Sequence, residues 1–218
     1  MFTEIIQLTR KDLLLEWRSK AAFGGMLLYV VSTIFVAYLS FKEVVSVPVW
    51  NALLWIILLF AATSAIARSF AEETEGKTLY LYTLARPQAI IIAKILYNGV
   101  TVSVLSFLSY FIYSLLIGNM VENQLMFLLS LFLGAIGFSS TLTLISAIAA
   151  QTNNNLTLMS ILGFPIILPL LITLISFSKN AVDGIAWSVN VKYILVLLLL
   201  NVIVVALSYL LFPYLWRD

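Results

Sequence analysis

The chain has 218 residues, of which 62% are hydrophobic and only 10% are charged, with a mean hydropathy of +1.08. A soluble domain carries about 25% charged residues, so this composition excludes a water-soluble fold and indicates a polytopic membrane protein. The absence of cysteine and histidine excludes disulfides, thiol chemistry and His-based acid–base catalysis, and a net charge of +2 is too small for a nucleic-acid surface. We expect one transmembrane domain over residues 1–218, without catalytic residues or a metal site.

The first twenty residues are too charged to cross a membrane, yet they have helical amphipathicity. The apolar side chains share one face and the polar ones the other: Phe2, Ile6, Leu13 and Trp17 against Glu4, Gln7, Lys11 and Arg18. Residues 1–20 are therefore predicted to form a cytoplasmic interfacial helix. The alternative is a solvated cytoplasmic tail.

Six apolar stretches follow, each about long enough to cross the hydrocarbon core. The predicted spans are 22–41, 48–67, 93–117, 124–150, 156–178 and 193–215. A polar run, Gln151 to Asn155, separates the fourth and fifth spans because five polar side chains are costly in lipid. The sequence predicts an all-α protein with six transmembrane helices, and residues 179–191 suggest a short external interfacial helix.

The orientation follows from the positions of lysine and arginine, which stay in the cytoplasm. Nine basic residues fall on one side of the six-span arrangement: Arg10, Lys11, Arg18, Lys20, Arg68, Lys77, Arg86, Lys94 and Arg217. Three fall on the other side: Lys42, Lys179 and Lys192. Both termini are expected to be cytoplasmic.

The connection over residues 68–92 is the longest cytoplasmic loop and combines an acidic cluster, a glycine turn and a proline that suits the start of a helix. Helix connections usually need about 2 to 8 residues, so a mere connector could be shorter. We interpret the loop as a docking element for a soluble partner; the alternative is a solvated charged loop. The candidate docking residues are Glu72, Glu73, Glu75, Gly76, Thr78, Leu79, Arg86 and Pro87.

The fifth span contains Gly163, Pro165 and Pro169, a spacing that predicts a break in its helical hydrogen bonding. A structural kink and a functional one are equally compatible with this pattern. In the fourth span, the small residues around Gly134 and Gly137 favour close helix packing over a transport pathway.

Tryptophan and tyrosine residues near the span ends are most simply interfacial anchors. They are Trp50, Trp55, Trp187, Tyr193, Tyr214 and Trp216.

Energy for any transport has to come from another protein. No span has a charged residue near its middle, which disfavours ion-coupled transport, and the chain has no Walker A sequence. Residue chemistry alone identifies no substrate, and it leaves open a permease for lipid, polysaccharide or drug as well as a non-transporting membrane scaffold.

Three segments resemble the type-2 ABC exporter permeases and, more narrowly, the CcmB-like haem exporter permeases of the bacterial cytochrome c maturation system. The first is Leu8–Arg18 and the third is Ile161–Ile172. The second is an order of residues between the second and third spans: Phe70, Glu72, Glu73, Gly76, Thr78, Leu79, Pro87 and Lys94. The likeness covers nearly the whole chain. It departs from the family pattern where Lys77 follows Gly76 and where Tyr80 takes an acidic position.

The resemblance implies a permease subunit, itself no enzyme, in a multi-pass arrangement in the bacterial inner membrane. It implies a cytoplasmic ABC ATPase as partner, a haem-handling membrane subunit, a haem chaperone and paired permease subunits. ATP would be used by the partner, and haem would be a transported or handled ligand rather than a cofactor held directly. Without histidine, this chain lacks the usual axial ligand of haem.

The topology can be tested by cysteine labelling, since the chain has no cysteine of its own. Lys77→Cys and Lys179→Cys are expected to react with a membrane-impermeant thiol reagent from opposite sides. Labelling of both positions from one side would contradict the six-span arrangement.

Overall fold

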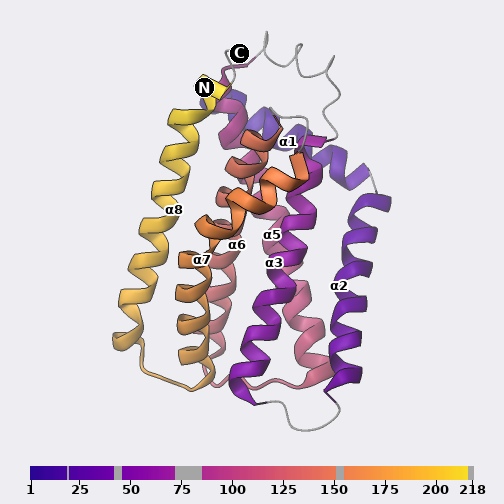
Figure 1. Ribbon diagram of the computed structural model, residues 1–218, viewed down its shortest axis with the longest axis vertical. Helices are drawn as coiled ribbons and strands as arrows, with labels where there is room; N and C mark the ends of the chain where they lie inside the picture. The colour runs from indigo at the N-terminus through magenta and orange to yellow at the C-terminus, as the bar shows by residue number, and fades with distance from the viewer. Residues whose placement is uncertain (19, 42–45, 72–84, 151–154, 216–218) are drawn as a thin grey trace.

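The computed structural model describes residues 1–18, 20–41, 46–71, 85–150 and 155–215. Within these ranges all regular structure is helical, which confirms the predicted all-α class. The helices are α1 (Phe2–Arg18), α2 (Lys20–Ser40), α3 (Val47–Ala71), α5 (Pro87–Ile117), α6 (Gln124–Ala149), α7 (Asn155–Val182) and α8 (Trp187–Leu215). Helices α2 to α8 form an up-and-down bundle, and α1 lies across one end of it (Figure 1).

Five of the described helices are long and apolar enough to cross a membrane. The qualifying stretches are Val47–Ala67, Pro87–Ile117, Gln124–Ala149, Ile161–Val182 and Trp187–Leu215. The first predicted span falls on α2, whose described apolar part, Gly24–Ser40, is shorter. The protein is therefore a multi-pass membrane protein, and the count of six spans stays a prediction.

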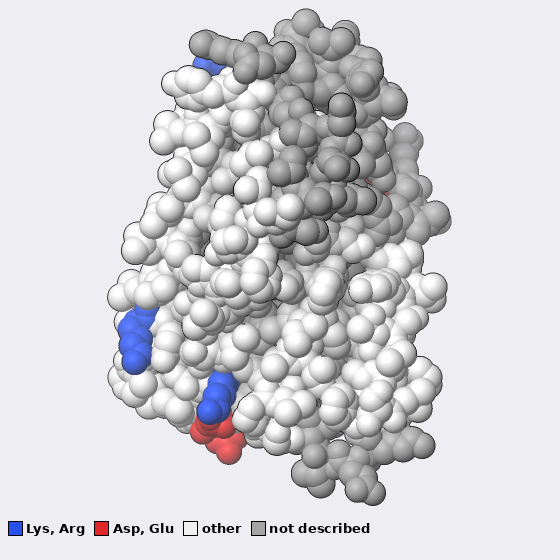
Figure 2. Space-filling model, viewed as in Figure 1, with Lys and Arg blue, Asp and Glu red and all other residues white. Residues whose placement is uncertain are grey.

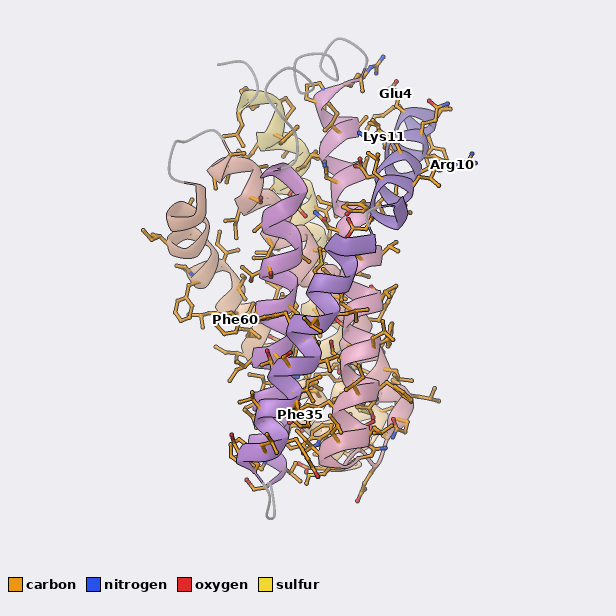
Figure 3. All side chains as sticks on the ribbon, turned by 90° about the vertical axis from the view of Figure 1, so that its right-hand side faces the viewer. Glu4, Arg10, Lys11, Phe35 and Phe60 are labelled. Carbon is orange, nitrogen blue, oxygen red and sulfur yellow. The ribbon has the colours of Figure 1, made fainter. Side chains whose placement is uncertain are left out.

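Among the described residues on the side of the bundle seen in Figure 2, charge is confined to basic residues toward both ends and acidic residues at one end. Large apolar side chains point outward along most helices, including Phe35 on α2 and Phe60 on α3 (Figure 3). Such a surface suits hydrocarbon, where unpaired charges are costly.

Helix α6 is the centre of the bundle, packing against α3, α5, α7 and α8. Lipid tails are as apolar as leucine, so helices in a membrane associate through close packing rather than through the hydrophobic effect. A Cβ atom added at Gly134 would lie 2.8 Å from two ring atoms of Trp55, and one at Gly137 would lie 2.7 Å from Leu170. The two glycines therefore admit neighbouring side chains, as the packing interpretation predicted.

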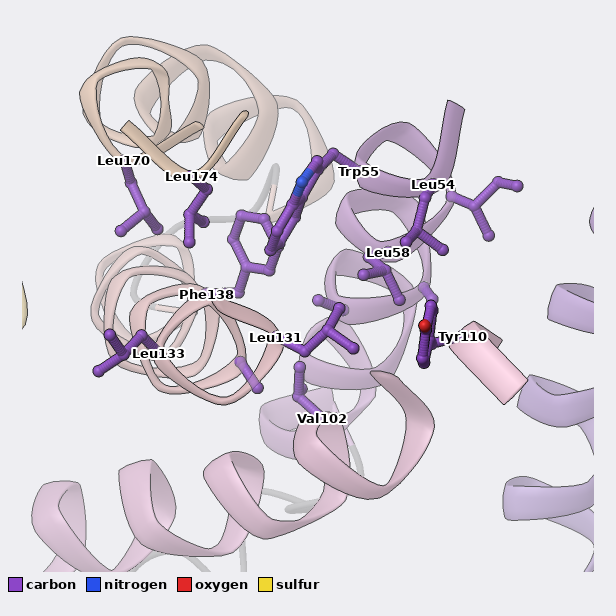
Figure 4. Close-up of a cluster of buried hydrophobic side chains, with 14 of the residues drawn as sticks. Leu54, Trp55, Leu58, Val102, Tyr110, Leu131, Leu133, Phe138, Leu170 and Leu174 are labelled. Atoms are coloured by element: carbon purple, nitrogen blue, oxygen red, sulfur yellow. The ribbon is translucent and has the colours of Figure 1, made fainter. Parts of the chain in front are cut away.

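Trp50 and Trp55 are fully buried, so the prediction that they anchor the chain at the membrane surface was wrong. Trp55 lies between α3, α6 and α7 and meets Phe138 edge-on, with ring centroids 6.1 Å apart (Figure 4). The Trp50 indole donates a hydrogen bond to the carbonyl of Gly118 at 3.0 Å. Each indole N–H finds a partner inside the bundle, so neither ring needs the headgroup layer.

The Trp55 indole is also held by a buried polar network between α3 and α7. It donates to Ser178 Oγ at 2.7 Å, and that hydroxyl lies 2.8 Å from Asn51 Oδ1. The Asn51 amide donates in turn to the carbonyl of Ile175 at 3.0 Å. Paired in this way, the polar atoms pin α3 to α7 at the end of the bundle remote from α1 (Figure 1).

The connection between α7 and α8 contradicts the external helix predicted over residues 179–191. Helix α7 continues to Val182 and α8 begins at Trp187, before the predicted start at residue 193. Gly184 turns the chain with a φ of +68°. Asn180 donates to Asn190 across the turn at 2.8 Å, so the two helices are joined directly by a short tied connection.

The residues of the predicted helix break, Gly163, Pro165 and Pro169, all lie within the continuous helix α7. Figure 1 shows the first part of α7 running obliquely across the bundle, whereas its second part runs along the other helices. Proline removes a backbone donor and crowds the preceding turn, which favours bending at such positions.

The tight contact at Gly134 predicts the outcome of a matched pair of substitutions. Gly134→Ala is expected to cost about 1–3 kcal/mol, because the Trp55 ring that the methyl group meets is held by its hydrogen bond and cannot move aside. Gly163→Ala is the control, since its nearest neighbours would lie at 3.7 and 3.8 Å. Thermal unfolding in detergent, followed by tryptophan fluorescence, should show a lower midpoint for Gly134→Ala alone. Equal midpoints would contradict the packing role.

Candidate functional site

The end of the bundle that carries α1 also carries the beginning of α5, directly after the predicted docking loop (Figure 1). The docking candidates from Glu72 to Leu79 lie outside the described residues. Arg86 and Pro87 are described: Arg86 is exposed with an extended backbone, and Pro87 is the first residue of α5, as predicted. The helix thus starts earlier than the predicted span, at residue 87 instead of 93, and Lys94 lies inside it.

Helix α1 packs along the first turns of α5 through a row of polar contacts. We call this row, together with its backbone contact, the α1–α5 ladder. Its members are Glu4, Thr9, Asp12 and Glu16 on α1, and Arg86, Ala93, Lys94 and Tyr97 on α5. Residues three or four apart lie on one side of a helix, so Asp12 and Glu16 face the same side of α1 and Lys94 and Tyr97 the same side of α5.

The central contact of the ladder is a buried ion pair. Lys94 Nζ lies 3.7 Å from Asp12 Oδ2, and the two residues are only 5% and 9% exposed. Lys11 Nζ lies 3.1 Å from the other carboxylate oxygen of Asp12. Because an uncompensated buried charge is very costly, each partner requires the other, and the pair fixes the register of α1 on α5.

Hydrogen bonds flank the ion pair. The hydroxyl of Tyr97 donates to Glu16 Oε2, while the other carboxylate oxygen of Glu16 is buried without a hydrogen-bond partner among the described residues. The hydroxyl of Thr9 lies 2.9 Å from the carbonyl of Ile5 and 3.4 Å from that of Ala93. These contacts attach α1 to α5 over about two turns of α1 rather than at one point.

Glu4, in the first turn of α1, continues the ladder toward Arg86, the residue before α5. A hydrogen bond from the Met1 ammonium group, at 3.0 Å, lowers the pKa of the Glu4 carboxyl. Desolvation opposes this shift, while the backbone and the charge of Arg86 lower the pKa further. The carboxylate form of Glu4 is therefore favoured beside the residue that precedes α5.

Sequence reasoning placed Glu4 and Lys11 on a polar face but missed the inward-facing Asp12 and Glu16. The available signal was the spacing of the acidic residues at positions 4, 12 and 16, which repeats at multiples of four and therefore defines one side of a helix. Of the four apolar residues predicted to face the headgroups, Phe2 and Ile6 are exposed and Leu13 is half-buried, while the Trp17 side chain lies outside the described residues.

The site offers mechanical attachment between two helices. Among the described residues, no group of three or more Asp and Glu side chains could hold a metal ion. The ladder consists of an ion pair and hydrogen bonds whose effect is to join an N-terminal helix to the first turns of a membrane span.

Comparison with known proteins gives one family. A family model described as CcmB protein matches residues 3–214, nearly the whole chain. No curated protein matches the chain.

The buried ion pair predicts that a second substitution restores the stability lost by the first. Lys94→Met is expected to cost about 3 kcal/mol, because it leaves the Asp12 carboxylate buried with Lys11 as its remaining ion-pair partner. Asp12→Leu combined with Lys94→Met should recover most of this loss, since apolar side chains can replace a buried pair. Lys179→Met, at an exposed position, is the control. The thermal unfolding midpoints of the wild type and the three variants would be measured in detergent. A double variant no more stable than Lys94→Met would contradict direct pairing.

Proposed function

This chain belongs to the CcmB protein family, and we propose that it couples ATP hydrolysis by a partner subunit to haem export or to the release of a haem-loaded chaperone. Family membership makes it a permease component of a cytochrome c maturation ABC transporter, hence a membrane subunit rather than an enzyme. The five long apolar helices agree with this assignment. The direction of coupling and the role of haem are parts of the proposal.

The observation that supports coupling is the position of the α1–α5 ladder. The loop that joins α3 to α5 enters the membrane domain at Pro87, and the ladder covers α5 from its N-cap to Tyr97. A partner that pushes on this loop would act first on the turns of α5 that α1 braces. We therefore propose that α1 and the beginning of α5 move as one unit.

Movement of that unit has a direct route into the bundle. Helix α5 packs against α2, α3, α6 and α8 in addition to α1. The Asn98 amide, one residue beyond the last ladder residue of α5, donates to Thr143 Oγ1 of the central helix α6 at 2.8 Å. A displacement of the first turns of α5 would therefore have a direct route to the central helix α6, because a packed interior transmits strain.

The assembly that we propose rests on membership of the CcmB family. A cytoplasmic ABC ATPase docks on residues 68–87, ATP is bound and hydrolysed by that partner, and two permease subunits work as a pair. A haem-handling membrane subunit and a haem chaperone complete the complex, while this chain holds no cofactor itself. The complex lies in the bacterial inner membrane with both ends of this chain in the cytoplasm.

Loop variants test the docking step. Replacing Glu72 and Glu73 by Lys, or Gly76 by Val, is expected to reduce co-purification of the ATPase and the yield of c-type cytochromes, with normal membrane insertion. Reversed charge at a partner surface repels the partner, and a branched residue resists a turn that needs positive φ. The control is Leu198→Ile on the exposed surface of α8. If the loop variants keep full ATPase binding and full cytochrome yield, the loop is only a connector and the docking proposal is contradicted.

A further inference from the structure

Helix α1 separates its charges by sign. The acidic side chains of Asp12 and Glu16 face α5 and are occupied by Lys94 and Tyr97. The basic side chains of the described part point the other way: Arg10 is exposed and points away from the bundle in Figure 3. The Lys11 side chain is 40% exposed although it contacts Asp12. Apart from Glu4, whose side chain is 33% exposed and pairs with the Met1 ammonium group, the charged residues on the free surface of α1 are therefore basic.

This basic surface is part of a shallow groove with apolar walls. The groove is lined by Gln7, Arg10, Lys11, Leu14 and Leu15. Both leucines are more than half exposed, and so are Phe2 and Ile6 further along the helix. Exposed leucine next to exposed arginine and lysine combines a hydrocarbon contact with an anion contact on one surface.

We propose that this groove binds an anionic phospholipid, with Arg10 and Lys11 on the headgroup phosphate and Leu14 and Leu15 against the acyl chains. Helix α1 lies across the end of the membrane-spanning helices, so its surface meets the boundary between headgroups and acyl chains (Figure 1). Basic residues at that depth attract anionic lipids. The proposal depends on the membrane orientation of the bundle and not on coupling to an ATPase.

A lipid explains the surface better than an acidic protein would. The basic pair stands between exposed apolar residues on both sides along the helix, Phe2 and Ile6 before it and Leu14 and Leu15 after it. An acidic protein surface would complement Arg10 and Lys11 and leave these apolar side chains against polar groups. A phospholipid satisfies both kinds of side chain in one molecule.

Lipid binding can be measured on the full chain by native mass spectrometry, with dioleoyl phosphatidylglycerol and dioleoyl phosphatidylcholine added separately at low salt. The wild type is expected to bind phosphatidylglycerol more tightly. Arg10→Gln with Lys11→Gln should weaken this binding about 30-fold, since each basic residue near the surface contributes about fivefold. Arg10→Gln alone should weaken it about fivefold; among the described residues no ion pair involves Arg10, so the fold should be preserved.

The control is Lys179→Gln with Lys192→Gln, which removes the same charge from exposed positions at the opposite end of the bundle. It should keep the preference for phosphatidylglycerol. Equal binding of the two lipids by the wild type, unchanged binding by the Arg10 and Lys11 variants, or an equal loss in the control would overturn the proposal. So would an Arg10 and Lys11 variant that loses the ATPase partner while its lipid binding is normal, because the surface would then contact an acidic protein.

Discussion

Burial of Asp12 beside Lys94 is the constraint from which the arrangement of this end of the protein follows. Transfer of a charge out of water costs several kcal/mol per ion, and the two residues offset part of this cost for each other. In a chain with so few charges, their pairing selects one register of α1 on α5, and Thr9 and Glu16 then meet Ala93 and Tyr97. Helix α1 is thereby fixed against α5. The turns of α5 next to the predicted docking loop are held by contacts with α1 in addition to the contacts within the bundle.

The opposite end of the bundle is held by different means. There, Asn51 and Trp55 of α3 meet Ser178 of α7 through hydrogen bonds, and Gly134 lets α6 approach the Trp55 ring. Hydrocarbon provides little driving force for helices to associate. Small residues that allow close packing and paired polar atoms have to hold the helices together instead. The bundle is thus held between α3 and α7 at one end and between α1 and α5 at the other, and the predicted docking loop precedes α5 at this second end.

Much of the fold could be predicted from sequence because hydrocarbon imposes long apolar stretches and proline marks a helix start; the stretches on α3 to α8 and Pro87 show this. The burial of Trp50 and Trp55 could not be predicted, because a tryptophan near the end of an apolar stretch occupies the same sequence position whether it faces headgroups or the core. The partners Asp12 and Lys94 stand far apart in sequence: Asp12 belongs to the predicted interfacial helix, and Lys94 was counted among the cytoplasmic basic residues. The turn at Gly184 was missed because the polar residues around it also suit an interfacial helix. The acidic cluster from Glu72 to Glu75 lies outside the described residues and stays a prediction.

The most direct test of the central claim, that α1 and the beginning of α5 move as one unit, is a cross-link between them in the assembled transporter. Thr9→Cys and Ala93→Cys, at positions in contact on the two helices, can be joined by a short thiol reagent in this cysteine-free chain. ATP hydrolysis by the complex and maturation of c-type cytochromes would be measured with and without the cross-link. If the two helices move together, the cross-linked complex keeps both activities at the level of the uncross-linked variant. Loss of ATP-driven maturation on cross-linking, with assembly intact, would show that α1 has to move against α5 and would contradict the account.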